Sequence, residues 1–237
     1  MIWTTVVVGM AFEARIAEGP GMHVICSANG PLLATLLART SIVGNCRGLI
    51  SFGDAGGLLP NLRPGTCVVG SAILSGGTRI ATDQPWSKAV LRRMPDAIYG
   101  MIAGVSAPVA EPDAKRALHI ETGAVAVDME SHIVAGVAVA LGLPMIAVRV
   151  VTDPAERALP QAVLAAFRPN GTTDIAAMLY SAMKRPRELP CLLRTALDAG
   201  MARSTLIRGR RVLEAGLALA DDPQIESPTR AKALPME

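Results

Sequence analysis

Short runs of apolar and β-branched residues alternate with longer Ala- and Leu-rich segments along this 237-residue chain. The runs predict strands near residues 5–9, 23–28, 48–53, 66–74, 125–128 and 145–151. Several are apolar at every position, as strands buried on both faces of a parallel or mixed sheet are. The intervening segments predict helices, among them residues 31–40, 131–141 and 161–166. Alternating strands and helices indicate an α/β sandwich with helices on both sides of one sheet.

The longest uncharged segment, residues 133–148, is a poor candidate for a membrane span. It is interrupted by Pro144, whereas a spanning helix needs about 20 consecutive apolar residues. The pattern predicts a buried helix, a turn at residues 142–144 and a buried strand. The N-terminal residues lack the basic start of a secretory signal. We therefore expect a soluble, cytoplasmic protein.

Composition predicts one large domain followed by a segment of different character. Hydrophobic residues make up 51% of the chain and aromatic residues only 3%, so Ala, Val, Leu and Ile must fill the core. From about residue 185 the chain is basic and helical in pattern, with Pro186 and Pro190 at its start. We predict a domain over residues 1–184 and a basic helical extension over residues 185–237 with a frayed end.

Charge and cysteine content argue against several classes of function. The net charge of +3 is too small to indicate nucleic-acid binding. The four cysteines lie far apart and the three histidines are isolated, so the chain predicts neither a disulfide framework nor a metal site. No G-x-G-x-x-G follows the first strand and G-x-S-x-G does not occur, which disfavours dinucleotide enzymes and serine hydrolases.

Acidic residues stand just beyond several predicted strands. Glu13 follows the first strand, Asp54 the third, Asp128 and Glu130 the fifth, and Asp153 the last. Ligands of open α/β sheets bind beyond the carboxyl ends of the strands. We therefore expect these side chains to surround one cleft.

The segment SFGDAGGLLPNLRPG, residues 51–65, predicts a glycine-rich turn after a buried strand. Such turns usually present backbone N–H groups to an anion, so a carboxylate within one needs an explanation. Asp54 either accepts hydrogen bonds from N–H groups of its own turn, as Asp commonly does, or takes part in chemistry at the cleft.

Four segments, in their order and spacing, resemble the superfamily of purine nucleoside phosphorylases and nucleosidases. They are VGMAFEA, SFGDAGGLLPNLRPGTCVV, VDMESHIVA and VRVVTDPAE. The resemblance covers residues 3–180 and is strongest for the methylthioadenosine/S-adenosylhomocysteine nucleosidases. Within that group, the short loops and basic tail are most similar to the hopanoid-associated branch, which acts on adenosylhopane.

This resemblance implies a three-layer α/β/α sandwich with a central mixed β-sheet. It also implies an enzyme that releases adenine from a 5′-substituted adenosine without a cofactor, as a homodimer or larger homo-oligomer. Cleavage of an N-ribosidic bond passes through an oxocarbenium-like sugar, as glycoside hydrolysis does. The reaction needs an acid for the departing purine, a base for water and a group that holds the ribose.

The resemblance assigns the acid to Asp153, which would protonate the purine near N7, and Thr152 would orient its carboxylate. Glu130 would accept hydrogen bonds from the ribose hydroxyls and stabilise the developing positive charge. Met129 would pack against the sugar. Glu13 would activate the water.

The resemblance further implies that Ala55 and Gly56 contact the substrate. Asp54 departs from the nucleosidase pattern, which usually has a small or apolar residue there. We consider that Asp54 shares the water with Glu13, which would raise the pKa of one of the two carboxyl groups.

Each acidic residue also has a structural interpretation. Asp153 precedes a proline and is typical of a turn that caps a helix. Asp128 and Glu130 favour the dipole of the helix that follows them, and Asp128 suits that role better. Glu13 is equally consistent with a solvated helical position.

Two other functions remain open. A phosphorylase would need an anion site, for which Arg63, Arg79 and Arg149 are candidates, although Glu13 and Asp54 would repel phosphate. A non-enzymatic nucleoside-binding module would keep the cleft and lack turnover.

The tail also raises the question of a lipid partner. Apolar residues alternate with Arg203, Arg208, Arg210 and Arg211, and the mean hydropathy of the chain is +0.38. Residues 78–93 are short for the lid that closes over small 5′ groups in the nucleosidases. We predict a large apolar 5′ substituent and peripheral contact with an anionic membrane on its cytoplasmic face. The alternative is a basic helix packed on the sandwich with its arginines in water.

Overall fold

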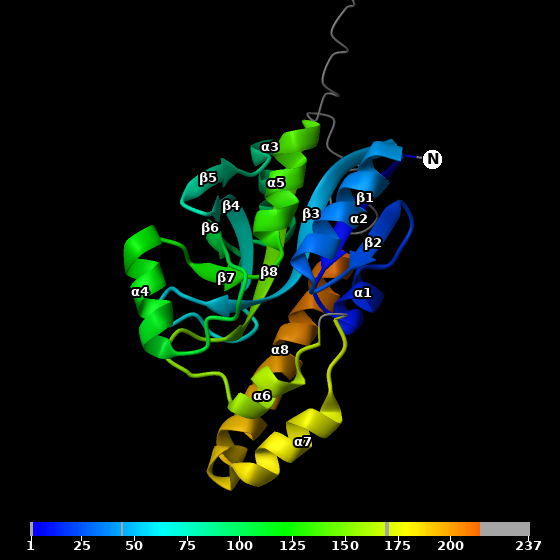
Figure 1. The fold of residues 1–237 in the computed structure, drawn as a ribbon. Helices are drawn as coiled ribbons and strands as arrows, with labels where there is room; N and C mark the ends of the chain where they lie inside the picture. The colour runs from blue at the N-terminus through cyan, green and yellow to red at the C-terminus, as the bar shows by residue number, and fades with distance from the viewer. Residues whose placement is uncertain (1, 44, 169–170, 214–237) are drawn as a thin grey trace, which may run out of the picture.

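The computed structural model describes residues 2–43, 45–168 and 171–213 of the chain (Figure 1). Its strands are β1 (Ile2–Val8), β2 (Met22–Cys26), β3 (Asn45–Gly57), β4 (Cys67–Ser75), β5 (Thr78–Ala81), β6 (Ile98–Gly104), β7 (Ala126–Asp128) and β8 (Met145–Asp153). Its helices are α1 (Ala11–Ala17), α2 (Gly30–Val43), α3 (Gln84–Arg93), α4 (Pro112–Thr122), α5 (Ser131–Leu141), α6 (Gln161–Ala166), α7 (Ile175–Lys184) and α8 (Leu189–Leu213), with a 3₁₀ turn at Pro186–Glu188.

The eight strands form one mixed sheet, as the alternation of strands and helices predicts. Strand β1 pairs in parallel with β2 and β3, and β3 pairs in parallel with β8. Strand β8 then pairs antiparallel with β4, and β4 pairs in parallel with β6 and β6 with β7. The end of β3 closes this path, because Gly56 and Gly57 pair with Val127 and Ala126 of β7. Strands β3, β8, β4, β6 and β7 thus form a closed circuit.

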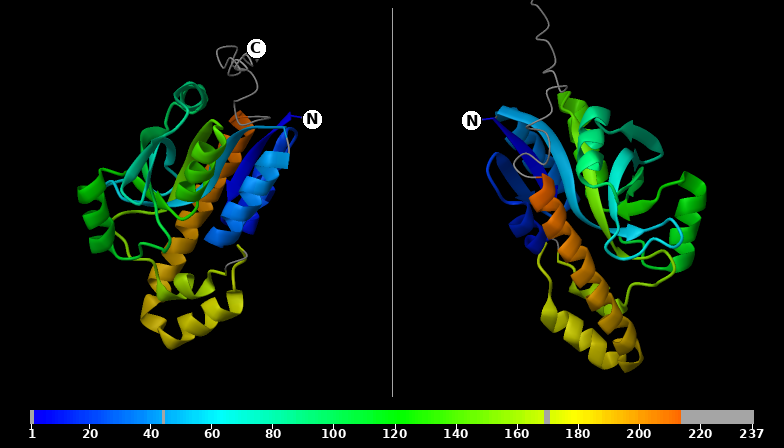
Figure 2. Two further views of the ribbon diagram at one scale, coloured as in Figure 1. Left: turned by 45° about the horizontal axis from the view of Figure 1, so that its top comes forward. Right: turned by 180° about the vertical axis from the view of Figure 1, so that it is seen from behind.

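Helices cover both faces of the sheet, so the molecule has the predicted three-layer α/β/α architecture (Figures 1 and 2). Successive residues of β1 point to opposite faces, as the strand period of two requires. Val6 and Val8 pack with residues of α1, α3 and α8, whereas Val7 packs with residues of α2 and α5. Most core side chains are aliphatic, and Trp86 of α3 is the largest fully buried one among the described residues.

Two helices have the predicted limits, residues 131–141 and residues 161–166. The uncharged segment over residues 133–148 is divided between α5 and β8 as predicted, and Gly142 ends α5 in the left-handed conformation that glycine adopts without strain. Strands β5 and β6 and helices α3, α4 and α7 were not among the segments singled out. Their sequences carry charged residues, glycines or exposed apolar residues, which interrupt the regular repeat of apolar and polar positions that predicts a strand or a helix.

The boundary predicted at residue 185 lies between α7 and α8. Helix α8 runs along the sheet (Figure 2), and it contributes Ala202, Leu206 and Leu213 to the same core cluster as β1, β3 and β8. Arg210 donates hydrogen bonds to the carbonyl oxygens of Ala17 and Glu18 at the end of α1. The C-terminal half of α8 is therefore packed on the sandwich. The predicted frayed end falls outside the described residues. No helix in the described part of the chain has the length and apolar character that crossing a membrane requires.

Candidate active site

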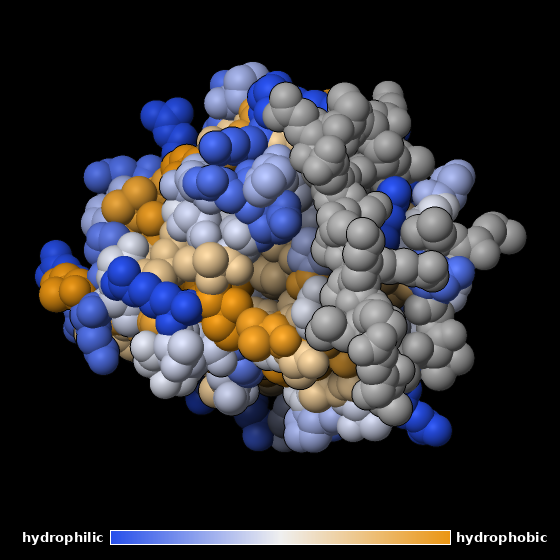
Figure 3. Space-filling view, turned by 90° about the horizontal axis from the view of Figure 1, so that it is seen from above, coloured by the Kyte–Doolittle hydropathy of each residue, from blue (hydrophilic) through white to orange (hydrophobic). Residues whose placement is uncertain are grey.

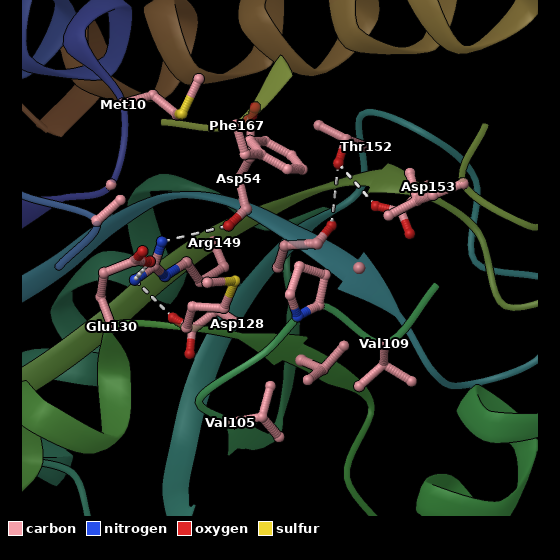
Figure 4. Close-up of a pocket in the computed structure, with 18 of the residues that line it drawn as sticks. Met10, Asp54, Val105, Val109, Asp128, Glu130, Arg149, Thr152, Asp153 and Phe167 are labelled. Atoms are coloured by element: carbon pink, nitrogen blue, oxygen red, sulfur yellow. Dashed lines mark hydrogen bonds and ion pairs between the residues drawn. The ribbon is translucent and has the colours of Figure 1, made fainter. Parts of the chain in front are cut away.

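A cavity of about 780 Å³ opens at the carboxyl ends of β1, β3, β7 and β8. All eight residues predicted to form the site line it: Glu13, Asp54, Ala55, Gly56, Met129, Glu130, Thr152 and Asp153. Asp128, Glu130 and Arg149 lie on one side, and Thr152 and Asp153 on the other, with Val105 and Val109 below (Figure 4). The fold thus brings the acidic side chains together around one cleft, as the sequence predicts.

Glu13 is held in place by backbone N–H groups. It is the third residue of α1, and its Oε2 accepts hydrogen bonds from Gly9 N (3.0 Å) and Met10 N (2.8 Å). Its Oε1 accepts one from Asp54 N (2.7 Å). The side chain is 2% exposed, so the solvated helical position considered above is wrong. Its carboxylate caps α1 and faces the cavity at the same time.

The glycine-rich segment is a continuation of β3 and not the predicted turn. The strand runs on to Gly57, and Gly53 has φ of 140°, where side chains are strained. A Cβ atom at Gly53 would lie 2.4 Å from Glu13 Oε1, and one at Gly56 would lie 3.2 Å from Asp153 Oδ2. These glycines therefore let carboxylates approach the backbone. Asp54 Oδ1 is buried and has no hydrogen-bond partner among the described residues.

Arg149 of β8 lies among the acidic residues on one side of the cavity. Its side chain is 1% exposed, and Nη2 lies 2.5 Å from Asp128 Oδ2 and 3.2 Å from Glu130 Oε2. It also donates to Ser51 Oγ (2.5 Å) and to the carbonyl oxygen of Asp54 (3.2 Å). Its charge offsets those of the carboxylates, which would otherwise be costly to bury together.

Asp128 performs the structural role foreseen for it. Its carboxylate accepts hydrogen bonds from Ser131 N at the start of α5 (3.2 and 3.3 Å) and from the Ser131 hydroxyl. Glu130 has no such cap bond. Its carboxylate comes close to the backbone of Gly9, where a Cβ atom would lie 2.6 Å from Glu130 Oε1. Glu130 therefore remains the acidic residue of this pair that is available to a ligand.

Asp153 is held from two sides at the end of β8. Its Oδ1 accepts a hydrogen bond from Thr152 Oγ1 (3.0 Å), as predicted for Thr152 (Figure 4). Its Oδ2 lies 2.6 Å from Nζ of Lys115, which comes from α4. Gly56 lies opposite these atoms and leaves room for them.

Burial raises the pKa values of four carboxyl groups at the cavity, those of Glu13, Asp54, Glu130 and Asp153. For Glu13 burial outweighs the lowering effect of Arg149, and for Asp153 it outweighs that of Lys115. The pKa of Asp54 lies well above its usual range because of burial and the charge of Glu13. Burial raises the pKa of Glu130 to about 7, against the effect of Arg149. Such a group of raised pKa values in one cavity is typical of sites for acid and base chemistry.

The remaining cavity wall includes the polar residues Asn29 and Arg168. An apolar wall comes from two segments, residues 105–109 and residues 159–168. Its side chains are those of Val105, Pro108, Val109, Leu159, Leu164 and Phe167. Phe167 is 47% exposed and lies above Asp54 in Figure 4. Residues 78–93, compared above with a lid, form β5 and α3 and do not line the cavity.

The arginines considered for an anion site are not placed for one. Arg63 and Arg79 are exposed and do not line the cavity. Arg149 lines it, but carboxylates and a hydroxyl already occupy its guanidinium group. Arg168 at the cavity wall is paired with Asp174 at 2.5 Å. In the described part of the chain, no three His, Cys, Asp or Glu side chains are arranged to hold a metal ion.

Comparison with known protein families identifies the family of this chain. The sequence profile described as "Phosphorylase superfamily" matches residues 6–184, which include every predicted site residue. The chain belongs to the phosphorylase superfamily. The match ends at the last residue of α7. A search of curated protein sequences finds no match.

Solved structures of the superfamily share the fold. Futalosine hydrolase of Helicobacter pylori is 18% identical, with 77% of this chain and 97% of that chain covered and a TM-score of 0.60. The methylthioadenosine/S-adenosylhomocysteine nucleosidase of the same organism, with butyl-thio-DADMe-Immucillin-A, is 15% identical over 90% and 96% of the chains, at 0.63. The nucleosidase of Campylobacter jejuni is 16% identical over 88% and 100%, at 0.59. At these identities the likeness shows the fold.

Sequence reasoning missed three contributions to this superfamily site. Arg149 was considered only as a phosphate ligand, although an arginine within a buried strand is itself a sign of buried carboxylates. Phe167 follows α6, where no polar motif marks the cavity wall. Lys115 lies in PDAKRALHIET, where charged neighbours such as Arg116 conceal it, and no pattern distinguishes it before the fold is known.

Proposed function

We propose that this protein hydrolyses the N-ribosidic bond of a 5′-substituted adenosine and releases adenine. The observation that best supports this function is the placement of carboxyl groups on different sides of the cavity. Asp153 lies on one side, Glu130 on the other and Asp54 between them in Figure 4, and the Glu13 carboxylate accepts a hydrogen bond from Asp54 N. This arrangement matches the needs of the reaction: an acid at the base, a carboxylate at the ribose and a base for water.

In the proposed hydrolysis, each bond that breaks and each proton that moves has a partner at the site. The bond between ribose C1′ and purine N9 breaks, and its electron pair goes to the purine. Asp153 gives its proton to N7, and burial keeps that proton available by raising the pKa of Asp153. Water adds to C1′ and loses a proton to the Glu13–Asp54 pair. Glu130 holds the ribose hydroxyls and stabilises the positive charge that develops on the sugar.

The unpartnered Oδ1 of Asp54 supports a shared water. It is buried beside Glu13, and each carboxyl group disfavours ionisation of its neighbour. A phosphate dianion would meet repulsion from the same two groups, and the arginines in reach are occupied. These contacts favour water over phosphate as the nucleophile.

We further propose that the 5′ substituent is large and apolar, with adenosylhopane as the substrate, in hopanoid biosynthesis. The support is the apolar wall over residues 105–109 and 159–168, together with the exposed Phe167 at its edge. A polar 5′ group such as an amino acid would leave its charges without partners at this wall.

One assay tests both parts. Adenine release is measured from methylthioadenosine and from an adenosylhopane-like lipid, with and without phosphate. Release without phosphate is expected, with a higher kcat/KM for the lipid. Release that requires phosphate, or binding without turnover, would contradict the hydrolysis. A higher kcat/KM for methylthioadenosine would contradict only the lipid substrate.

An exposed apolar surface at the α7–α8 end supports a membrane partner. We call the following residues the apolar end: Ile175, Leu179 and Met183 of α7, and Leu189, Leu193 and Leu197 of α8. Each set recurs every four residues, so it forms one stripe on its helix. Exposed Lys184, Arg185, Arg187 and Arg194 accompany it. Basic residues beside an exposed apolar stripe favour anionic lipid.

The position of the apolar end also suits a lipid substrate. Helix α7 packs against α6, which carries Leu164 of the cavity wall. In Figure 1 α7 and the start of α8 project beyond the sheet. The opposite end, seen from above in Figure 3, mixes polar and apolar side chains. We therefore propose that the α7–α8 end, and not the arginines at residues 203–211, rests on the membrane.

Vesicle sedimentation tests this proposal. The protein should sediment with anionic vesicles at low salt and much less at high salt, because the basic residues are screened. Leu179→Glu with Leu193→Glu should abolish sedimentation, whereas Ile120→Glu, at an exposed position (76%) on α4, should not. No sedimentation of the unchanged protein would refute the proposal. A dimer lost in the same double variant would assign the apolar end to a second copy of the chain.

A further inference from the structure

Lys115 lies against the proposed acid and has no part in the function described so far. It comes from α4, none of whose residues line the cavity, and it reaches Asp153 from behind the cavity wall. Its side chain is 0% exposed, although lysine is almost never fully buried without a partner. Its neighbour Arg116 is exposed. The fold therefore places this ammonium group in the interior at one particular point.

Hydrogen bonds account for all three protons of the Lys115 ammonium group. They go to Asp153 Oδ2 (2.6 Å), to the carbonyl oxygen of Pro154 (3.0 Å) and to that of Arg157 (3.0 Å). Lys115 thus connects α4 by hydrogen bonds to Asp153 and to the turn that follows β8. A charge-assisted bond of this length also fixes the direction of the Asp153 carboxyl group.

The other oxygen of Asp153 is suited to carry a proton. Thr152 Oγ1 lies 3.0 Å from Asp153 Oδ1 and 3.3 Å from the carbonyl oxygen of Ala55. The one hydroxyl proton of Thr152 can go to Oδ1 when Asp153 is ionised. It can go to Ala55 when Oδ1 is protonated, and Oγ1 is then free to accept. Both protonation states of Asp153 are therefore satisfied without movement of the backbone.

We propose that Lys115 is the positioning residue of the acid: it holds Oδ2 of Asp153, so that Oδ1 carries the proton and faces the purine. This inference rests on the proposed function, in which Asp153 protonates N7. As the C1′–N9 bond breaks, the proton passes from Oδ1 to N7 and Asp153 becomes a carboxylate. Lys115 keeps its own protons throughout and stabilises the negative charge that remains.

Two opposing effects act on Asp153. Burial raises its pKa, and the ammonium group of Lys115 lowers it. Asp54 of β3 is the other charged group that interacts with Asp153 across the cavity. Without Lys115, burial and Asp54 would leave Asp153 protonated to a higher pH and make it a weaker acid. The lysine therefore opposes the effect of burial and keeps Asp153 a stronger acid than burial alone would allow.

The pH dependence of kcat tests this role, with methylthioadenosine as the probe substrate. Lys115→Met should lower kcat at least about 10-fold and move the alkaline limb of the profile up by about one pH unit or more, since an opposite charge at this distance has an effect of that size. Lys115→Arg restores the charge and should keep the limb near its original position. Arg116→Met, on the exposed side of α4, should change neither kcat nor the limb.

A double-variant comparison separates positioning from a structural role. In Asp153→Asn the acid is gone, so adding Lys115→Met should change the remaining turnover less than about 2-fold. A further loss in that background, or an unshifted limb in Lys115→Met, would overturn the proposal. If Lys115→Met fails to fold, the comparison still holds, because the double variant contains neither buried charge.

A failure of the proposed hydrolysis can be distinguished from a failure of the Lys115 proposal. If the unchanged protein releases adenine only with phosphate, hydrolysis is wrong, and the same variants are compared in that reaction. If it releases none, the thermal unfolding midpoints of the two single variants and the double variant still measure the coupling. Lower midpoints for both single variants, with recovery in the double variant, are expected. Additive midpoints would overturn the pairing.

Discussion

Gly53→Ala should abolish most of the proposed activity by displacing the Glu13 carboxylate, which lies against residue 53 in the fold although the two residues are far apart in the sequence. A Cβ atom at residue 53 would lie 2.4 Å from Oε1, 2.6 Å from Cδ and 2.8 Å from Oε2 of Glu13. Ordinary contacts begin at 3.4 Å, so the carboxylate would have to retreat by about 1 Å. A misplacement of that size costs about 10²-fold in rate. We expect kcat to fall by about that factor.

The same change has a separate effect on stability. Alanine at φ of 140° is strained, and the retreat of Glu13 breaks the 2.7 Å hydrogen bond from Asp54 N. Together these losses should lower the free energy of unfolding by about 2–4 kcal/mol. Gly77→Ala is the matched control: its φ is 85°, and nothing lies within 4 Å of the new Cβ. It should lose stability by strain alone and keep full activity.

Adenine release and thermal unfolding are measured on both variants, so that the effect on activity is separated from the effect on stability. A Gly53→Ala protein that is folded at the assay temperature and turns over within about 3-fold of the unchanged protein would refute the reasoning, because a displacement of about 1 Å at the base should cost far more. Equal loss of activity in Gly77→Ala would assign the effect to general destabilisation.

Three further predictions follow from the carboxyl groups. Asp153→Asn keeps the shape but removes the proton, so kcat should fall at least about 10²-fold with little change in KM; unchanged turnover in a steady-state assay would exclude Asp153 as the acid. Asp54→Asn removes a negative charge beside Glu13, so the acidic limb of the kcat profile should move to lower pH, whereas an unshifted limb would mean that the two do not share a site. The folded protein holds Glu130 at a pKa of about 7, above the 4.5 of a free glutamate side chain, so the stability that its proton provides is complete below pH 4.5 and is lost as the pH rises through about 7. Glu130→Gln should therefore flatten the fall in the free energy of unfolding between pH 5 and 7.5, by at most about 3 kcal/mol, and an equally steep fall in the variant would assign it to the other carboxyl groups.

The position of most of the acidic residues could be predicted from the sequence because one rule covers them. Each follows a recognisable buried strand, and β1, β3 and β8 are parallel and bring their carboxyl ends to the same edge. Asp128 and Glu130 lie at the end of β7, which is antiparallel to β3 and reaches the cavity through its pairing with Gly56 and Gly57. Glu13 needs only the turn after β1, and Asp153 only the end of β8. The local pattern is therefore sufficient to bring together groups that are far apart in the chain.

The residues that could not be predicted depend on contacts between distant segments. Lys115 is buried because α4 packs where the turn after β8 offers it carbonyl oxygens, and no local pattern encodes that. Strand β3 runs through its glycines because β8 and β7 pair with them, which overrides the tendency of Gly53 to end a strand. The apolar wall comes from residues 105–109 and from α6 with its flanking residues, and the helical pattern of residues 161–166 does not show which side chains face the cavity.

The closed circuit of β3, β8, β4, β6 and β7 separates the parts of this protein whose geometry is fixed from those that can vary. Asp54, Asp128 and Asp153 all stand on strands of the circuit, so their spacing changes only if the whole circuit changes. The apolar wall belongs to residues 105–109 and 159–168, which lie outside those strands. We therefore expect that exchanging these two segments can accommodate new substrates, while the carboxyl groups proposed to act on the ribosidic bond keep their geometry.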